Sequence, residues 1–487
     1  MDVEPQLSWS RAFGELRVNM LGGTTFQEQK SLQLVRSGSG FTSNSQIYNL
    51  AAATRTRIVA DNQVVYRYQA GFARVNASWK DRYIINLTGR RDGSSRFGPG
   101  RQFANFGAVG AAWLFSREEL LSGLDVLSFG KLRASYGTSG NDQIGDYQFL
   151  DTYTSSGINY GGVIGLEPSR LYNPDFGWET NKKFEVALDA GFLNDRIFFT
   201  AAYYSNRSSS QLVGIPLPGT TGFASLQANL DATVENSGWE FTLNSDYIKS
   251  SGFTWTTAVN LTMARNRLKS FPGLEGSTYR NRYMIGEPLN IRKVYTYEGV
   301  DPQTGLYKFR DYNGDGAITA SEDQKGIVDL NPEFYGGIQN TIKAGQWQLD
   351  FLFQFVKQKN YSPTYSFWVP GSMMNQPTGV LDHWQQPGQG GKHQLYTTGL
   401  NDEAAAGFDR FLASDAVIED ASFIRLKNVS LSYTLPEKWL KGIQCRLFVE
   451  GQNLLTITRF SGADPESPLV GFLPPLRIIT SGLNVTF

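Results

Sequence analysis

The sequence has little that could crosslink it or anchor it through a helix. Cys445 is its only cysteine, and it contains no run of about 18 consecutive apolar residues. One cysteine cannot form a disulfide within the chain or supply the Cys-rich spacing of a structural zinc site. Without a long apolar run, a transmembrane helix is excluded. Cys445 lies among the apolar positions of a strand, and we interpret it as a small hydrophobic residue.

Net charge and an export signal are also lacking. Forty-five Lys and Arg residues balance 45 Asp and Glu residues, and the pI is about 6.8. Nucleic-acid-binding proteins usually carry a basic excess or stripe, so no nucleic acid partner is expected. The start of the chain, MDVEPQLSWSRAF, has neither the charged nor the apolar part of a signal peptide. We therefore expect a truncated chain or one half of a larger protein.

Signatures of catalysis are missing as well. The sequence has two histidines, His383 and His393, and neither has a nearby cysteine or a spaced acidic partner. We find no nucleophile elbow, no phosphate-binding glycine loop and no convincing carboxylate pair. The chain is therefore not expected to be an enzyme.

What the chain does have is alternation of apolar and polar residues at period two. In residues 346–355, one face carries Trp347 and three phenylalanines, and the other carries Gln346, Gln348, Asp350 and Gln354. Segments 239–247 and 253–266 alternate in the same way. A strand of about 10 residues that faces lipid on one side and a wet lumen on the other has this pattern. The final segment, PLRIITSGLNVTF, places Leu483, Val485 and the terminal Phe487 on one such face.

The connections between these strands alternate between short and long. The predicted short, periplasmic connections are Phe13–Glu15, Trp79–Asp81, 116–127, Leu193–Asp195, Lys249–Ser251, Ala344–Gly345 and 436–444. The predicted outer connections are 28–63, a short one at 95–100, 140–177, 212–232, 268–334, 360–421 and 457–474. Outer-membrane barrels have this asymmetry between their two ends. Within 116–127, Ser116 and Glu119 have the spacing of a capping box, which predicts a short helix.

The fold class predicted is therefore all-β, a transmembrane antiparallel up-and-down β-barrel. Counting gives about fifteen strands, the first of which descends through residues 6–12. Single-chain bacterial barrels have an even number of strands, and large plugged transporters have about 22. Residues 1–487 are thus expected to be the C-terminal part of a larger barrel.

Several segments resemble those of a known family, both in their amino-acid sequence and in their order along the chain. They are RRDGSSRFG (90–98), LRASYGTSGNDQIGDY (132–147), the hairpin beginning NPDFGWET (173–212), NSGWEF (near 237), DYNGDGAITASED (311–323), NPEFYGGIQN (331–340), FIRLKNVSLSYTLP (423–436) and GQNLLT (451–456). Together they resemble the SusC/RagA family of TonB-dependent outer-membrane transporters. The resemblance covers the C-terminal two-thirds of such a barrel, and the family's plug domain and first strands have no counterpart in this sequence.

The outer connection 268–334 contains a calcium-loop motif. Residues 311–322 fit D-x-[DN]-x-[DN]-G-x₅-E in full, with Gly316 at the sharp turn. The predicted Ca²⁺ ligands are Asp311, Asn313, Asp315, the Ala317 carbonyl, Thr319 through water, and Glu322. The alternative is an Asp- and Asn-rich turn that binds no metal. Because GLYKFR before the loop alternates like a strand, we do not expect the helical flanks of an EF-hand.

The outer connection 360–421 is rich in aromatic residues and in Gln and Asn. The aromatic residues are Tyr361, Tyr365, Phe367, Trp368 and Trp384. Aromatic faces beside planar amides suit sugar rings, so Tyr361, Tyr365, Trp368 and Trp384 are candidate substrate-binding residues. The alternatives are packing against other loops or against a partner protein.

These observations favour a nutrient importer in the outer membrane of a Gram-negative bacterium. The resemblance implies a SusD-like lipoprotein that closes the outer mouth, TonB acting through a plug domain absent from this sequence, and an oligosaccharide or peptide as cargo. An alternative is a secreted or surface-attached β-rich protein that binds glycans without transport.

Overall fold

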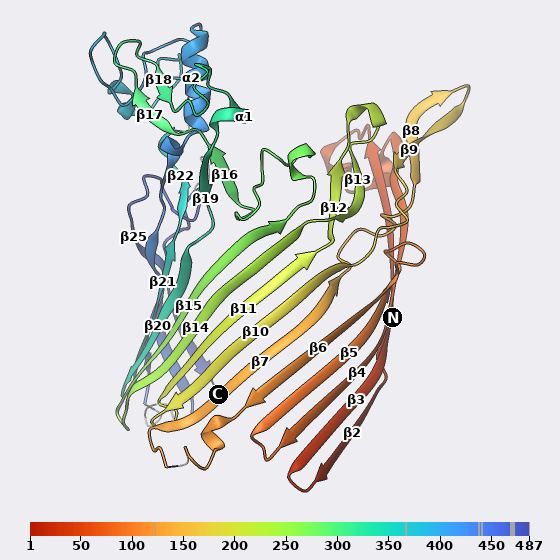
Figure 1. Cartoon of the computed structure of the whole chain (residues 1–487), viewed down its shortest axis with the longest axis vertical. Helices are drawn as coiled ribbons and strands as arrows, with labels where there is room; N and C mark the ends of the chain where they lie inside the picture. Colours follow the sequence, from red (N-terminus) through yellow and green to blue (C-terminus); the bar gives the residue numbers. More distant parts are fainter. Residues whose placement is uncertain (122, 366–367, 437–438, 440–441, 468–472, 487) are drawn as a thin grey trace. The chain divides into compact units, whose positions relative to one another are not determined.

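In the computed structural model, a single antiparallel sheet runs through most of the chain (Figure 1). The structure describes residues 1–487 apart from 122, 366–367, 437–438, 440–441, 468–472 and 487. Phe367 and Phe487 therefore lie outside the described residues. The strands of the sheet are β1 Asp2–Val3, β2 Gln6–Phe13, β3 Leu16–Ser39, β4 Arg55–Trp79, β5 Tyr83–Ser94, β6 Phe103–Trp113, β7 Leu127–Asn141, β10 Glu179–Phe192, β11 Ile197–Ser209, β14 Thr233–Lys249, β15 Phe253–Ser270, β20 Phe334–Ala344, β21 Trp347–Lys357, β24 Phe423–Thr434, β25 Gln444–Thr458 and β26 Ile478–Thr486.

The number of strands agrees with the prediction. The sheet has 16 strands, but β1 and β2 both pair with β3 and so share one position, which leaves fifteen. Pro5 separates β1 from β2, and proline cannot donate a ladder hydrogen bond. The strands follow one another in chain order, as in an up-and-down barrel.

The predicted tight turns are found at one end of the strands. Backbone angles in the left-handed region close two of them, with φ of 56° at Gly345 and 50° at Asp81. Three successive residues, Leu193–Asp195, adopt this conformation between β10 and β11. Two-residue hairpin turns with positive φ match the twist of the strands they connect, which explains why these turns are short.

The long connections at the other end contain small structures of their own. Their hairpins and strand pairs are β8 Thr152–Tyr160 with β9 Val163–Arg170, β12 Gln211–Pro216 with β13 Ser225–Leu230, β16 Ile291–Val294 with β19 Gly326–Asp329, β17 Tyr297–Val300 with β18 Tyr307–Phe309, and β22 Lys359–Tyr361 with β23 Ile418–Asp420. The predicted connection 28–63 is wrong in extent. Strands β3 and β4 continue far beyond the expected ends, and the connection is only 40–54.

The helix predicted within 116–127 is also wrong for the described residues. A 3₁₀ turn at Phe115–Arg117 is followed by turns whose amides bond three residues back, as from Leu124 to Leu121. The Ser116 hydroxyl donates to the Gly130 carbonyl at 3.3 Å instead of capping a helix. This hydrogen bond joins the short segment to strand β7.

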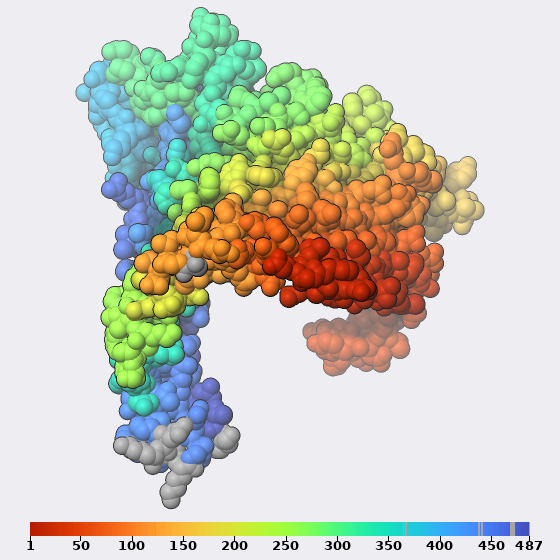
Figure 2. Space-filling model, turned by 60° about the horizontal axis from the view of Figure 1, so that its bottom comes forward, coloured from red at the N-terminus to blue at the C-terminus, as the bar shows by residue number. Residues whose placement is uncertain are grey.

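By its internal packing the chain divides into two units. The first comprises Met1–Phe115, Leu132–Val186 and Asn206–Val234, and the second comprises Ser116–Lys131, Ala187–Ser205 and Glu235–Phe487. In the first unit, β3 to β6 pair in chain order, and the surface colour in Figure 2 passes correspondingly from red to orange. The second unit holds β15 to β26 and both predicted functional loops.

Each unit exposes large apolar side chains on one face of its strands. In the second unit these are Trp255, Met263, Ile338, Trp347, Ile424, Leu431, Leu447, Val449, Leu455, Ile457 and Leu483. In the first unit they are Trp9, Met20, Trp79, Tyr83, Ile85, Leu87, Val109, Trp113, Leu132 and Tyr136. The strand register places them on a common face, for example Leu87 opposite Val109 and Leu431 opposite Val449. A sheet of a water-soluble protein would bury such an apolar face against other protein, whereas in a membrane barrel the face contacts lipid and no protein covers it.

Aromatic pairs lie beside the tight turns in both units. In the first unit Trp79 stacks on Tyr83 at 5.5 Å, and in the second Trp347 contacts Tyr433 at 4.8 Å and Tyr247 contacts Trp255 at 5.6 Å. Aromatic rings of this kind concentrate where a membrane meets water. None of the helices among the described residues is long and apolar enough to span a membrane.

Candidate functional site

Two outer connections fold together into one compact body, which we call the loop module. It comprises the described residues of 291–329 and 360–421, and it includes helix α2, Asp402–Leu412. Its hydrophobic core consists of Tyr295, Tyr307, Phe309, Phe408, Phe411 and Val417. Phe411 on α2 stacks on Tyr307 of β18 with ring centroids 4.4 Å apart. Figure 1 shows β17, β18 and α2 grouped at one end of the strands.

Helix α2 turns its apolar side to the core. Asn401 caps its first turn by accepting a hydrogen bond from the Ala404 amide at 3.0 Å. Ala404, Phe408 and Phe411 then recur on one side of the helix and are buried. The helix therefore forms where local capping and long-range burial agree.

Backbone hydrogen bonds join the two connections of the module. The Tyr295 amide donates to the Ala413 carbonyl at 3.0 Å, and the Asp415 amide donates to the Tyr295 carbonyl at 3.0 Å. The Asp415 carboxylate also accepts from the Tyr297 amide at 2.9 Å. Because these bonds satisfy backbone groups of both connections, neither connection can move independently without breaking them.

The predicted calcium loop forms a closed turn that its own backbone satisfies. The Asp311 carboxylate accepts from the amides of Gly314 at 2.7 Å and Gly316 at 2.8 Å. Asp315 accepts from the Ala317 amide at 2.7 Å, and Asn313 donates to Asp315 at 2.9 Å. Positions 1, 3 and 5 of the motif are thus drawn together by the turn.

The last ligand of the motif is not drawn in with them. Glu322 belongs to the short helix α1, Ala320–Asp323, and its carboxylate lies 3.9 Å from the Lys325 ammonium. The neighbouring Asp323 is buried and accepts from the amides of Thr319 and Tyr312, which lowers the pKa of its carboxyl. Among the described residues, no three acidic, histidine or cysteine side chains converge closely enough to hold a metal ion. Calcium binding by residues 311–322 therefore stays a prediction.

The predicted substrate-binding aromatic residues occupy three different environments. Tyr361 and Tyr365 pack against the core of the loop module, and burial raises the pKa of Tyr365. The Trp384 indole donates to the Pro302 carbonyl at 2.9 Å and so joins the two connections. Trp368 is exposed. The structure therefore brings Tyr361 and Tyr365 together as packing residues, whereas Trp368 stands apart at the surface.

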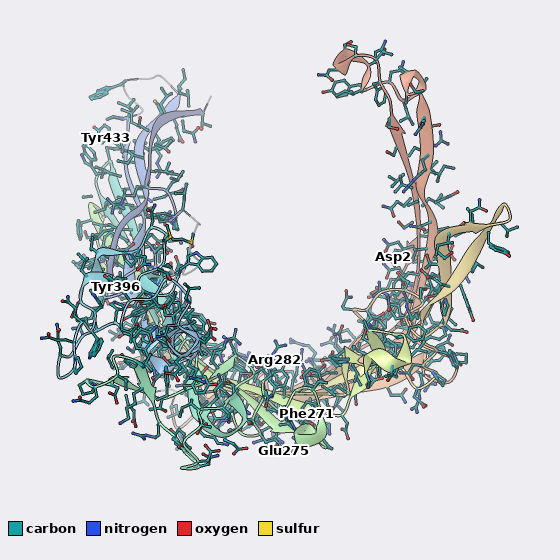
Figure 3. All side chains as sticks on the ribbon, turned by 90° about the horizontal axis from the view of Figure 1, so that it is seen from above. Asp2, Phe271, Glu275, Arg282, Tyr396 and Tyr433 are labelled. Carbon is teal, nitrogen blue, oxygen red and sulfur yellow. The ribbon has the colours of Figure 1, made fainter. Side chains whose placement is uncertain are left out.

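The two histidines also take part in packing. His393 is buried, and its Nδ1 lies 3.1 Å from the Tyr307 hydroxyl, while burial lowers the pKa of its imidazole. His383 stacks on Tyr396, a residue labelled in Figure 3, at a centroid distance of 3.5 Å. The Tyr297 and Tyr307 hydroxyls are likewise held neutral, because burial raises the pKa of Tyr297 to about 12 and also raises that of Tyr307.

A second feature of this unit was not predicted from the sequence. On the polar face of β24, the fully buried Arg425 donates to Asp464 at 2.5 Å and to Glu466 at 2.6 Å. Both acids belong to the connection that follows β25, so the ion pairs hold this connection against the sheet. The signal in the sequence was two cationic residues, Arg425 and Lys427, in strand β24 and two acids in a distant loop.

Glu466 also borders a cavity of about 570 Å³ on the polar face of β20, β21 and β24. It is lined by Asn260, Pro332, Tyr335, Gly336, Gly337, Leu352, Gln354, Val356, Gln358, Asn360, Phe423, Lys427, Pro465 and Glu466. Gln354 donates to Glu466 at 3.1 Å, and Lys427 lies 3.7 Å from the same carboxylate. Phe271, Glu275 and Arg282, which are labelled in Figure 3, lie in the connection before β20 but do not line this cavity.

With this geometry established, comparison with known proteins assigns the family. The family described as TonB dependent receptor-like, beta-barrel matches residues 2–454. The chain belongs to this family. Among curated TonB-dependent receptors, P3 of Formosa agariphila is 28% identical over 99% of this chain and 52% of its own length. SusC of Bacteroides thetaiotaomicron is 26% identical over 88% of this chain and 44% of its own length.

The solved structures agree with this assignment at the level of fold. The RagAB peptide transporter superposes on this TonB-dependent receptor barrel with a TM-score of 0.85, at 23% identity, over 100% of this chain and 55% of that chain. The resemblance to the SusC/RagA type is thereby confirmed, and so are the β-barrel class and the outer-membrane location. The chain spans about half the length of the curated relatives it matches.

The TonB-dependent receptor barrel explains the bare apolar faces. They are the surfaces that meet lipid, and the polar faces line the lumen. A secreted, water-soluble glycan-binding protein would have no use for exposed rows of Trp, Leu and Ile on its strands. The tight turns are then the periplasmic connections, and the loop module belongs to the cell exterior.

Proposed function

We propose that this chain forms most of the barrel wall of a TonB-dependent importer that takes up oligosaccharides together with a SusD-like surface lipoprotein. Energy from TonB would reach the cargo through a plug domain supplied outside these 487 residues. The barrel performs no bond chemistry: it provides a polar path, a lipid-facing surface and a rigid outer platform. The observation that carries the proposal is the family match over residues 2–454.

The loop module supports the proposed lipoprotein partner. Its hydrophobic core makes the module rigid. The exposed apolar side chains of the module include Trp368, Met373, Leu381 and Leu400. Exposed apolar side chains near polar ones are typical of protein interaction surfaces. Replacing Met373 and Leu400 by aspartate should reduce the amount of lipoprotein that co-purifies from outer membranes. Gln386→Asp, at an exposed polar site of the module, is the matched control.

Uptake tests the transport function directly. A strain that lacks the gene should lose growth on at least one polysaccharide as sole carbon source, and a plasmid copy should restore that growth. Growth on peptides should not change. Loss of growth only on peptides would redirect the proposal to peptide import, as the RagAB transporter is named for, and unchanged growth on every carbon source would reject it.

A surface-attached glycan-binding protein without transport is the remaining alternative. Labelled oligosaccharide separates the two functions, because an importer changes the amount that enters the cell, whereas a binder changes only the amount retained at the surface. The importer proposal fails if the deletion strain retains less glycan at its surface but accumulates it internally at the native rate.

A further inference from the structure

We infer that the cavity on the lumen face of β20, β21 and β24 is a cargo site for neutral oligosaccharide, with Tyr335 as its aromatic platform. The inference rests on the proposed function, since it concerns the path that the cargo follows. Apart from Asn360, the lining residues lie outside the aromatic-rich connection 360–421. The cavity of about 570 Å³ is within the range of small-molecule sites, about 300–1,000 Å³.

The cavity lies on the lumen face because of the strand register. Tyr335 and Gly337 of β20 pair with Val356 and Gln354 of β21, opposite in direction to the lipid-facing Phe353 and Phe355. Side chains at alternate positions of a strand point to opposite faces. The lining side chains Tyr335 and Gln354 therefore face the polar interior, where a transported solute passes.

Two glycines make the cavity possible. A Cβ at Gly337 would lie 3.3 Å from the Leu352 methyl and 3.6 Å from the Asn260 amide, so a larger side chain there would enter the cavity. A Cβ at Gly336 would lie only 2.1 Å from the Asn260 carbonyl, on the face that packs Phe355. Gly336 thus allows the strands to approach closely, and Gly337 leaves space in front of Tyr335.

The charges at the cavity are already paired, which favours a neutral ligand. The charged lining residues that the structure describes are Lys427 and Glu466. Glu466 is bound by Arg425 at 2.6 Å and lies 3.7 Å from the Lys427 ammonium, so these charges are paired with each other. A charged cargo would have to compete with these ion pairs. A neutral one has no such cost.

What the lining does offer is carboxamides beside a ring and apolar surface. Asn260, Gln354, Gln358 and Asn360 carry groups that both donate and accept hydrogen bonds, as sugar hydroxyls do. Tyr335 is 44% exposed, and Val356 and Phe423 add apolar surface. Gln354 Oε1 is moreover buried without a hydrogen-bond partner, so the wall alone does not satisfy its polar groups. Carboxamides and an aromatic face together match the hydroxyl edges and C–H faces of a pyranose ring.

The test is direct binding to the purified full chain in detergent. Isothermal titration uses defined neutral trisaccharides (maltotriose, xylotriose and chitotriose) and the tripeptide Ala-Ala-Ala as probes. The native chain should bind at least one trisaccharide, and Tyr335→Ala should weaken that binding at least tenfold. Gln339→Ala is the matched control, because Gln339 shares the strand and the lumen face but does not line the cavity.

A second variant separates loss of the site from loss of the fold. Gly337→Val should abolish binding by filling the cavity, while heat-modifiable migration on a gel shows that the barrel persists. The inference is overturned if Tyr335→Ala and Gly337→Val bind the trisaccharide as the native chain does, if Gln339→Ala weakens binding equally, or if only the tripeptide binds. The inference is also overturned if the native chain binds none of the probes. The importer function is tested separately, by the growth and uptake assays.

Discussion

At the scale of single residues, the loop module depends on close approaches that only particular side chains allow. Gly305 sits in the left-handed region with φ of 73°, and an added Cβ would lie 2.4 Å from the Trp384 ring. Trp384 in turn reaches the Pro302 carbonyl. One glycine therefore lets an indole cover the turn between β17 and β18.

Replacing Gly305 by alanine should therefore destabilise the module more than its backbone angle alone predicts. Overpacking costs about 1–3 kcal/mol beyond the cost of positive φ. Gly388 is the matched control, since its φ is 87° but nothing lies within 4 Å of an added Cβ. Hydrogen exchange of the β17 and β18 amides should accelerate in Gly305→Ala and much less in Gly388→Ala. Equal acceleration in both would show that the contact with Trp384 does not matter.

The buried His393 should make the module sensitive to acid. Burial lowers the pKa of its imidazole below the ordinary value, helped by Lys392 and His383 and opposed by Asp382. The unfolded chain then binds more protons than the folded one, so stability is complete above a pH of about 6.5 and falls as the pH drops toward the lowered folded-state pKa. Protease cleavage within 360–421 should thus increase between pH 7 and pH 5. His393→Gln should reduce this pH dependence, and an unchanged profile would assign it to other groups.

At the scale of elements, local patterns determine the strands, whereas distant contacts determine the loops. The turn at Gly345 and the alternation of 346–355 were predictable because period two and positive φ are local properties. The pairing of Tyr307 with Phe411 was not, because it joins two connections that are separated by strands β20 and β21. For the same reason the sequence pointed to Tyr361 and Tyr365 as candidate binding residues without showing that they pack against a core. The cavity beside Tyr335 depends on four strands and an ion-paired loop, so it could not be predicted from the sequence of any single segment.

The lipid face of β21 supports a prediction about charge. Phe353 points to lipid near the middle of the strand, and arginine there should cost about 2–4 kcal/mol. Gln339 lies at nearly the same depth on the lumen face, so Gln339→Arg is the matched control. The amount of folded, heat-modifiable protein in the outer membrane should fall for Phe353→Arg and not for the control. A similar fall in both variants would mean that the faces are assigned incorrectly.

The calcium loop is an element whose prediction still needs a measurement. Asp311, Asn313 and Asp315 are already drawn together, and a bidentate Glu322 would complete the oxygen set. Calcium should therefore raise the temperature at which the loop module unfolds, and a chelator should reverse the effect. Glu322→Gln should remove this response, while the neighbouring Ser321→Ala should keep it. A temperature that is the same with calcium and with chelator would identify the loop as a turn without metal.

At the scale of the whole molecule, the alternation of short and long connections makes a prediction about sidedness in each unit. In the second unit, Leu400 lies in an outer connection and Ser251 in a tight turn; in the first unit, Tyr160 and Asp81 have the corresponding places. Single cysteines at these four sites, in a Cys445→Ser background, can be labelled on intact cells with a maleimide too large for the outer membrane. Cysteine at Leu400 or Tyr160 should react at once, and cysteine at Ser251 or Asp81 only after the outer membrane is permeabilised. The same order must hold in both units, because strands of even and odd position reverse direction in an up-and-down barrel.

Reaction at Ser251 on intact cells would place the tight turns outside and would remove the loop module from the surface where a lipoprotein could contact it.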